Sequence, residues 1–351
     1  MCVPRLPSFS ELQPYLERID NSHLYSNFGP LVNEFENRLA DYFQIPVEQL
    51  ATCSNATDAL EGALRTSGSR QEKWDAPSWT FTATAAALVA SGVDFTFRDI
   101  DETQRIRIDS SFQNIVEVLP FGEGLNFDRY RYPTRNLLVD AAASFDALKT
   151  MHLPTDRRVG IVLSFHATKT LSTGEGGLFI SNDPEWVLEF KKWSNFGMWG
   201  SRISSIPGSN SKMNEYSAAI GLASLDSWPR TRLEWLSQMK TANELSQKYR
   251  FNVNKSLENN LVSPYWNLIL DDSLEIDKAI TVLDRNEISW RRWWDHGCKS
   301  MPAYASFPSE ELAQSDDISK RTIGIPIYLG MSARDTGRLE ESLAIISLIR
   351  E

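Results

Sequence analysis

Apolar runs that suit buried strands alternate with helical stretches through the first half of the chain. The strand-like runs are rich in valine, isoleucine and leucine, and they lie near residue 51 and at 93–97, 115–119, 137–140, 159–163 and 178–180. Helical spacing begins near Pro30, recurs up to about Arg65, and returns in a small-residue stretch that opens at 76–84 and that Gly92 closes. This alternation predicts an α/β fold with a largely parallel sheet covered on both faces.

The last third of the chain repeats the pattern on a smaller scale. Apolar positions at helical spacing, from Leu233 to Leu245, predict a long linking helix after Pro229. Strand-like and helical runs then follow at 265–270, 275–283, 288 and 323–327. A capping box at Ser332 and Asp335 begins a final helix, whose inward residues should be Leu339, Leu343 and Ile346. We predict a large domain over 1–230, and a linking helix with a small α/β domain over 231–351.

The composition indicates a globular protein without a membrane span. Of the 351 residues, 42% are hydrophobic and 23% are charged, and no apolar run approaches the ~18 residues that a spanning helix needs. A formal net charge of -10 argues against a general nucleic-acid binder, which needs a basic face. Three widely separated cysteines indicate neither a disulfide framework nor a metal site, and the first residues lack an apolar secretion signal. We therefore expect a cytoplasmic protein.

One lysine lies between a buried strand and a glycine-rich turn. Lys169 follows the run at 159–163, and Gly174, Gly176 and Gly177 break the chain before the next strand. Desolvation at a strand end disfavours an ammonium ion, so a lysine there can act as a free amine and attack a carbonyl to form a Schiff base. A solvated lysine beside an ordinary turn would give the same local pattern, so other residues must decide between these interpretations.

Two further features fall at the ends of predicted strands. Residues 54–57 lead from a short strand into a helix, where backbone amides and the hydroxyls of Ser54 and Thr57 can hold a phosphate, although the same residues can simply cap the helix. Asp140 ends the run at 137–140. Because ligands of open α/β sheets gather beyond the carboxyl ends of the strands, we expect Asp140, the 54–57 turn and Lys169 to face one crevice.

The stretch from Ser164 to Gly177, with Asp140 and the 54–57 turn before it, resembles the DegT/DnrJ/EryC1/StrS family of pyridoxal phosphate-dependent sugar aminotransferases. The resemblance runs from about Asn27 to Trp228, with the motifs in the family's order, and it continues more weakly to the C terminus. It implies a fold-type I protein like aspartate aminotransferase. Such a protein has a three-layer domain with a mostly parallel seven-stranded sheet, followed by a smaller C-terminal α/β domain.

The resemblance also implies roles for single residues. Lys169 matches the lysine that holds the cofactor, pyridoxal 5′-phosphate, as a Schiff base and then moves a proton as acid and base. Asp140 matches the aspartate that pairs with the ring nitrogen, and Phe81, two residues after Trp79, matches the aromatic that stacks on the ring. The residues that match the phosphate-holding positions are Ala56, Thr57 and Ser164, together with Asn210 from the neighbouring subunit. We therefore expect a homodimer with shared active sites.

Other residues of these motifs fall on the substrate side. His166, Asn195 and Phe196 lie in segments that the resemblance places near the sugar. His166 can equally be a local hydrogen-bonding residue at a strand end, and Glu175 is more simply a solvated turn residue than a general base.

The chain departs from the family's pattern at one position beside the cofactor. Family members usually carry glutamine or histidine three residues after the aspartate, against the cofactor's phenolic oxygen, and this chain has Ala143. Water or Ser144 would have to supply the missing donor. A second branch of the family, the sugar 3-dehydratases, has histidine in place of the lysine, and Lys169 argues against that branch.

The resemblance implies a ping-pong aminotransferase of amino-sugar and polysaccharide biosynthesis. L-glutamate would donate its amine to a nucleotide-linked keto sugar, and the string from Ser164 to Lys169 favours a dTDP-4-keto-6-deoxyhexose. The segment from Trp290 to Trp294 either offers arginines to a diphosphate and indoles to a base, or forms a core edge with solvated arginines. Two alternatives are a C3-aminotransferase for 3-keto sugars and a non-catalytic sensor or partner protein that holds the cofactor.

Overall fold

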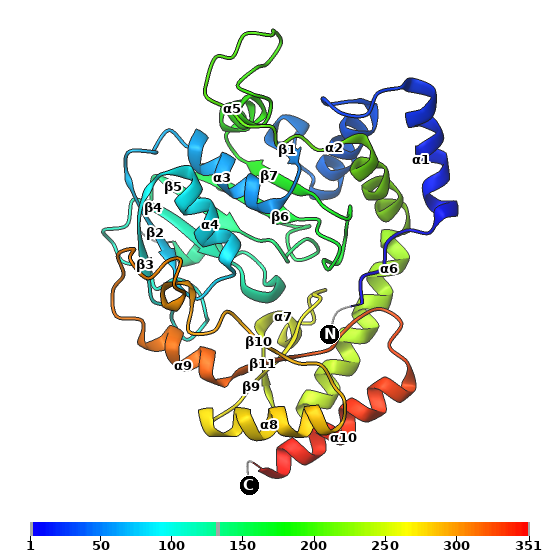
Figure 1. The fold of residues 1–351 in the computed structure, drawn as a ribbon, viewed down its shortest axis with the longest axis vertical. Helices are drawn as coiled ribbons and strands as arrows, with labels where there is room; N and C mark the ends of the chain where they lie inside the picture. The colour runs from blue at the N-terminus through cyan, green and yellow to red at the C-terminus, as the bar shows by residue number, and fades with distance from the viewer. Residues whose placement is uncertain (1–2, 131–133, 350–351) are drawn as a thin grey trace.

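The computed structural model describes residues 3–130 and 134–349, and a seven-stranded sheet forms its centre (Figure 1). The strand order is β1-β7-β6-β5-β4-β2-β3. Strands β2 to β6 pair in parallel, whereas β7 is antiparallel to both of its neighbours. The prediction of an α/β fold with a mostly parallel sheet is confirmed. The strands are β1 (Leu50–Cys53), β2 (Lys73–Pro77), β3 (Asp94–Arg98), β4 (Asn114–Val118), β5 (Asn136–Asp140), β6 (Arg158–Ser164) and β7 (Gly177–Ser181).

Alternate residues of the central strands face two different helical layers. Leu137 and Val139 of β5 belong to the core shared with α2 and α6, whereas Leu138 belongs to the core shared with α3, α4 and α5. Because both faces are covered, the middle of β5 is an uninterrupted apolar run that shows no polar alternation. The helices of this part are α1 (Phe9–Ser22), α2 (Pro30–Phe43), α3 (Ala56–Thr66), α4 (Thr82–Ser91) and α5 (Pro184–Ser194).

The long helix α6 (Glu215–Lys248) leads to a smaller antiparallel sheet, which lies in the lower part of Figure 1. Its strand order is β10-β11-β9-β8. Within the described residues, no helix combines the length and apolar character needed to cross a membrane. The elements of this part are α7 (Lys255–Glu258), α8 (Ser273–Arg285), α9 (Ala313–Arg321), α10 (Ala333–Ile349), β8 (Asn252–Val253), β9 (Trp266–Ile269), β10 (Arg291–Arg292) and β11 (Thr322–Ile325).

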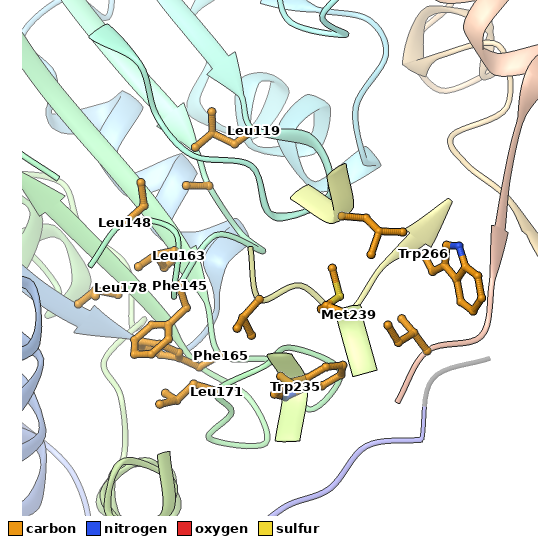
Figure 2. Close-up of a cluster of buried hydrophobic side chains, with 14 of the residues drawn as sticks. Leu119, Phe145, Leu148, Leu163, Phe165, Leu171, Leu178, Trp235, Met239 and Trp266 are labelled. Atoms are coloured by element: carbon orange, nitrogen blue, oxygen red, sulfur yellow. The ribbon is translucent and has the colours of Figure 1, made fainter. Parts of the chain in front are cut away.

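One continuous core joins the two sheets. Figure 2 shows it running from Leu163 and Leu178 of the large sheet, past Trp235 and Met239 of α6, to Trp266 of β9. The boundary predicted at residue 230 falls inside α6, which passes through it unbroken. The division into two domains therefore stays a prediction.

The linking helix is longer than predicted. It begins at Glu215 and continues through Pro229, where a proline removes a helical hydrogen bond at a cost of about 3 kcal/mol. Trp228 and Trp235 are buried on either side of the proline, and their packing holds the helix together. Leu233, which the spacing placed on the inward face, is 66% exposed.

Other predicted elements are shifted. Residues 76–77, expected to open a helix, end β2 instead, and α4 begins only at Thr82. The strand expected near Ile288 lies further along, at β10. The final helix begins as predicted, because Ser332 and Asp335 exchange the hydrogen bonds of a capping box.

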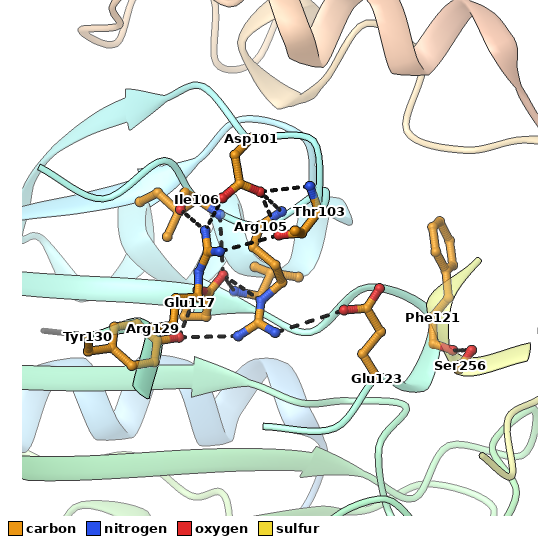
Figure 3. A network of polar contacts seen from close by, with 11 residues as sticks. Asp101, Thr103, Arg105, Ile106, Glu117, Phe121, Glu123, Arg129, Tyr130 and Ser256 are labelled. Atoms are coloured by element: carbon orange, nitrogen blue, oxygen red, sulfur yellow. Dashed lines mark hydrogen bonds and ion pairs between the residues drawn. The ribbon is translucent and has the colours of Figure 1, made fainter. Parts of the chain in front are cut away.

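A buried ionic network lies behind the carboxyl end of β4 (Figure 3). The Glu117 carboxylate is fully buried, and it contacts the guanidinium groups of Arg105 (3.2 Å) and Arg129 (3.6 Å) and accepts a hydrogen bond from the Tyr130 hydroxyl (2.7 Å). Glu123 lies at the edge of this network, 3.8 Å from Arg105, and its other carboxylate oxygen has no hydrogen-bond partner within the described part of the chain. Burial raises the pKa of Glu123 to about 7.

We expect this raised pKa to make the protein less stable as the pH rises toward neutrality. Between the usual glutamate pKa of 4.5 and about 7, the native state holds a proton on Glu123 that the unfolded chain has lost. The free energy of unfolding should therefore fall through this window, by an amount on the order of 1 to 3 kcal/mol, and Glu123→Gln should flatten the change.

Urea unfolding of both proteins at about pH 5 and pH 8 measures the difference. Glu258→Gln, which changes a carboxylate on the exposed side of α7, is the matched control and should keep the pH dependence of the unaltered protein. If Glu123→Gln keeps the pH dependence of the unaltered protein, Glu123 is not the group that causes it.

Candidate active site

A cavity of about 780 Å³ opens at the carboxyl edge of the large sheet, between the two halves of the molecule. The first half contributes the ends of β4, β5 and β6 and the starts of α3 and α4. The second half contributes Tyr265, Arg291, Trp293 and Trp294. The residues predicted for the site that line this cavity are Ala56, Thr57, Phe81, Asp140, Ser164, His166 and Lys169.

Asp140 lies at the inner end of the cavity, where β5 ends. Its side chain is held from two sides, because the Thr84 hydroxyl donates to one carboxylate oxygen (2.7 Å) and the Ala142 amide donates to the other (3.1 Å). Asp140 is only 6% exposed, and this burial raises the pKa of its carboxyl group, while the bonds from Thr84 and Ala142 and the charge of Lys169 oppose the rise. A buried carboxylate of this kind favours a cationic partner inside the cavity.

Lys169 lies on the turn after β6, and its side chain enters the same cavity. The amine donates a hydrogen bond to the Tyr265 hydroxyl (2.9 Å), and it lies 5.4 Å from the centre of the Tyr265 ring. The Lys169 amide is bonded to the His166 carbonyl (2.8 Å), which fixes the turn. The amine is therefore half-buried and directed into the cavity.

The start of α3 provides a concave group of backbone amides. Asn55 caps the helix by accepting a hydrogen bond from the Asp58 amide (2.9 Å), which leaves the amides of Ala56 and Thr57 at the cavity wall. Gly177 of β7 allows the close approach, because a Cβ atom there would lie 2.5 Å from the Asn55 carbonyl carbon and oxygen. Ser164, at the end of β6, lines the cavity nearby. Helix capping by Asn55 is therefore observed, and the anion site stays a prediction that the position of these amides allows.

Aromatic side chains form the outer walls. Phe81 caps the start of α4, lines the cavity and is 59% exposed, whereas Trp79 is buried against Phe121 and Trp294. On the opposite side, the rings of Phe121 and Trp294 stack with centroids 4.9 Å apart. The Trp293 indole fixes this wall by donating to Asn267 (2.6 Å). The cavity is thus suited to a flat polar ring with a flanking apolar surface.

Several neighbours of the site have local partners. His166 shares a hydrogen bond with the Thr168 hydroxyl (2.9 Å) and lies 3.6 Å from Glu175, which is exposed. Ala143 lines the cavity with an apolar methyl group. Ser144, considered above as a replacement donor, is fully buried outside the cavity lining.

The remaining predicted residues lie away from the cavity. Asn195 and Asn210 pair across the loop between α5 and α6, and the Phe196 amide donates to the Ser209 carbonyl (2.7 Å) in the same loop. This loop extends away from both sheets at the top of Figure 1. Asn210 is exposed and accepts a hydrogen bond from Lys212 (2.7 Å). The structure therefore does not bring these residues to the cavity of their own chain.

Sequence reasoning missed Tyr265 and Thr84. The sequence pattern predicts Tyr265 only as the first residue of a strand and Thr84 only as part of a small-residue helix. A hydroxyl directed at a buried charge leaves no periodic signal in a sequence, so only the fold could identify them.

Comparisons with known proteins identify the family and the fold of this chain. A sequence model of the DegT/DnrJ/EryC1/StrS aminotransferase family matches residues 9–344. The dTDP-4-amino-4,6-dideoxy-D-glucose transaminase of Shigella dysenteriae is 33% identical over 64% of this chain and 63% of that enzyme. The GDP-perosamine synthase of Vibrio cholerae is 25% identical over 90% of this chain and 91% of its own. The crystal structure of DesI with its TDP-sugar product has a TM-score of 0.82 and 25% identity, covering 99% of this chain and 92% of DesI.

The family match covers nearly the whole chain, and the structural match extends across both sheets. The chain belongs to the DegT/DnrJ/EryC1/StrS aminotransferase family and is a sugar aminotransferase that uses pyridoxal 5′-phosphate.

Proposed function

We propose that this enzyme transfers the amino group of L-glutamate to a nucleotide-linked keto sugar, and that the acceptor is a dTDP-4-keto-6-deoxyhexose. The observation that carries the proposal is the placement of the Lys169 amine and the buried Asp140 carboxylate in one cavity with the start of helix α3. The names of relatives from Shigella dysenteriae and Vibrio cholerae support a 4-amino sugar product, one with dTDP and the other with GDP.

The donor set of the cavity fits the cofactor. Asp140 would pair with the ring nitrogen, Phe81 would cover the ring, and the Ala56 and Thr57 amides with the Ser164 hydroxyl would hold the phosphate. When bound, pyridoxal phosphate supplies an aldehyde and an electron-withdrawing ring that stabilises charge at the reacting carbon. Ala143 leaves the phenolic oxygen without a side-chain donor, and the Tyr265 hydroxyl, which already contacts the amine, is our candidate for that donor.

The side chains of this chain have separate tasks in the proposed reaction. Lys169 accepts and returns the proton at the reacting carbon, because its amine is the basic group directed into the cavity. Asp140 stays ionised next to the ring cation, and Thr84 and Ala142 fix the orientation of its carboxylate.

The role of Tyr265 gives a testable result. Tyr265→Phe removes one hydroxyl and keeps the ring, so we expect kcat to fall roughly tenfold and the pH at which the visible absorption of the bound cofactor changes to shift. Adding Ala143→Gln to this variant should restore the spectrum, since it returns a donor to the phenolic oxygen. An unchanged absorption profile in Tyr265→Phe would reject this role, whatever the change in rate.

We also propose a homodimer in which the loop between α5 and α6 completes the neighbouring active site. Apolar residues are exposed on and beside this loop, where Tyr25 stacks on Tyr216 (6.3 Å) and Phe28 contacts Trp199 (5.2 Å). Ile203, in the same loop, is 76% exposed. A second copy of the chain would cover this surface and bring Asn210 to the partner's cofactor phosphate.

Ile203→Asp should therefore weaken the dimer and lower the affinity for the cofactor. Light scattering during gel filtration gives the mass, which should be twice 39.8 kDa for the unaltered protein. Leu348→Asp, at a residue that is 69% exposed on α10, is the control and should remain dimeric. A monomeric unaltered enzyme with full activity would contradict shared sites.

The proposed function is tested by incubating the purified enzyme with L-glutamate and a panel of nucleotide keto sugars. The panel contains a 4-keto sugar and a 3-keto sugar on dTDP, which tests the position of amination. It also contains a 4-keto sugar on GDP, which tests the choice of nucleotide. Mass and stereochemical analysis of the product should show amination at C4 of the dTDP sugar. Amination at C3 would support the C3 alternative, and a bound cofactor that glutamate leaves unconverted would support a non-catalytic protein.

A further inference from the structure

Two neighbouring arginines on β10 have different surroundings. Consecutive residues of a strand point to opposite faces, and here Arg291 lines the active-site cavity while Arg292 pairs with Asp277 on α8 (2.7 Å). The Arg291 guanidinium lies 5.2 Å from the centre of the Trp293 ring. Across residues 3–130 and 134–349, no carboxylate pairs with Arg291 and no hydrogen bond occupies its side chain. Its donors are therefore open to a ligand.

The position of Arg291 is built by residues from three strands. Gly324 of β11 is the register partner of Arg291 on the neighbouring strand. A Cβ atom on this glycine would lie 2.4 Å from the Trp293 indole nitrogen. The indole occupies that space and donates to Asn267 of β9 (2.6 Å). Trp293 is thereby fixed, and its ring supports the guanidinium through a cation–π contact. The Arg291 side chain is exposed, and this contact holds its guanidinium at the cavity wall.

We propose that Arg291 is the anchor for the diphosphate of the nucleotide-linked sugar, while Arg292 has no part in binding. An arginine fork can bind phosphate oxygens with paired hydrogen bonds. Two cationic side chains, Lys169 and Arg291, are among the described residues that line the cavity. The Lys169 amine already bonds to Tyr265, so Arg291 is the cation that is open to a diphosphate. Arg291 is exposed at the edge of the cavity, which suits a group that trails outward from the sugar.

The inference rests on the proposed function, and the test separates the two. Binding of inorganic pyrophosphate, dTDP and GDP to the enzyme loaded with its cofactor is measured by calorimetry, for the unaltered protein, Arg291→Gln and Arg292→Gln. The bound cofactor keeps the probes out of the cofactor's own phosphate site. We expect Arg291→Gln to weaken dTDP binding at least about tenfold, because one charged pair of hydrogen bonds is lost. Arg292→Gln removes only a solvent-exposed ion pair and should change binding less than about twofold.

The half-reaction with glutamate, followed by the loss of visible absorption, should be unaffected in both variants. Equal dTDP and pyrophosphate affinities in Arg291→Gln and the unaltered protein would overturn the inference. A glutamate half-reaction that slows in Arg291→Gln while dTDP binding is kept would also overturn it, because the arginine would then bind the carboxylate of the amino donor. If the unaltered enzyme aminates no keto sugar but dTDP binding still depends on Arg291, the anchor stands and the proposed function falls.

Discussion

Lys169→Ala is expected to lose transamination by roughly a thousandfold or more while keeping the fold. The variant lacks both the amine that meets the aldehyde and the group that moves the proton, and no other lysine among the described residues lines the cavity. The cost to stability should be small, because within the described structure the half-buried side chain makes one hydrogen bond, to Tyr265. Single-turnover kinetics with glutamate and circular dichroism measure the two effects.

Borohydride reduction of the unaltered enzyme gives a second readout. It should attach the cofactor permanently to Lys169, which peptide mass analysis identifies, and the Lys169→Ala variant should release its cofactor on unfolding. Lys149→Ala is the control, since Lys149 is exposed outside the cavity and packs on the Tyr42 ring. Near-normal turnover in Lys169→Ala, or labelling of another lysine, would show that the amine was misassigned.

Asp140→Asn has the second largest expected effect, a fall in kcat of roughly a hundredfold with the cofactor still bound. Asparagine has nearly the same shape but no negative charge, so the ring nitrogen would lose its proton and the ring would withdraw electrons less strongly. Burial raises the pKa of Asp140, so the charged group costs stability in the protein without its cofactor. The cofactor-free variant should therefore melt at or above the temperature of the unaltered protein.

Thermal unfolding with and without the cofactor measures the cost of the Asp140 charge and its gain from the bound cofactor. The cofactor should raise the melting temperature of the unaltered protein more than that of Asp140→Asn, because only the carboxylate gains a charged partner. Undiminished turnover in the variant would refute the role given to Asp140.

The large sheet was predictable because its strands are buried on both faces. Leu137 to Val139 and Val159 to Leu163 are apolar without interruption, which a strand at the surface would not allow. β2 was missed for the opposite reason. It begins at exposed Lys73 and contains Asp75, whose charge is balanced by Arg98 of β3 at 2.7 Å, and no local pattern reveals such a partner.

The site could be predicted only where its residues belong to short local motifs. Asp140, Lys169 and the 54–57 turn each end a strand, and the edge of a parallel sheet brings such ends together. Tyr265 is separated from Lys169 by 96 positions and reaches it because the second sheet packs across the cavity. The Trp290–Trp294 segment showed two arginines among tryptophans, but only the pairing of Arg292 with Asp277 distinguishes them.

The cavity is assembled from residues that the ribosome adds at widely separated times. Its floor is complete once β7 has been made, but its far wall depends on Tyr265 and Trp294, which follow after the whole of α6. A nascent chain that ends before Tyr265 therefore lacks both the hydroxyl that contacts the Lys169 amine and the tryptophans of the far wall. Pyridoxal phosphate should therefore bind late in biogenesis, after the C-terminal third of the chain has left the ribosome.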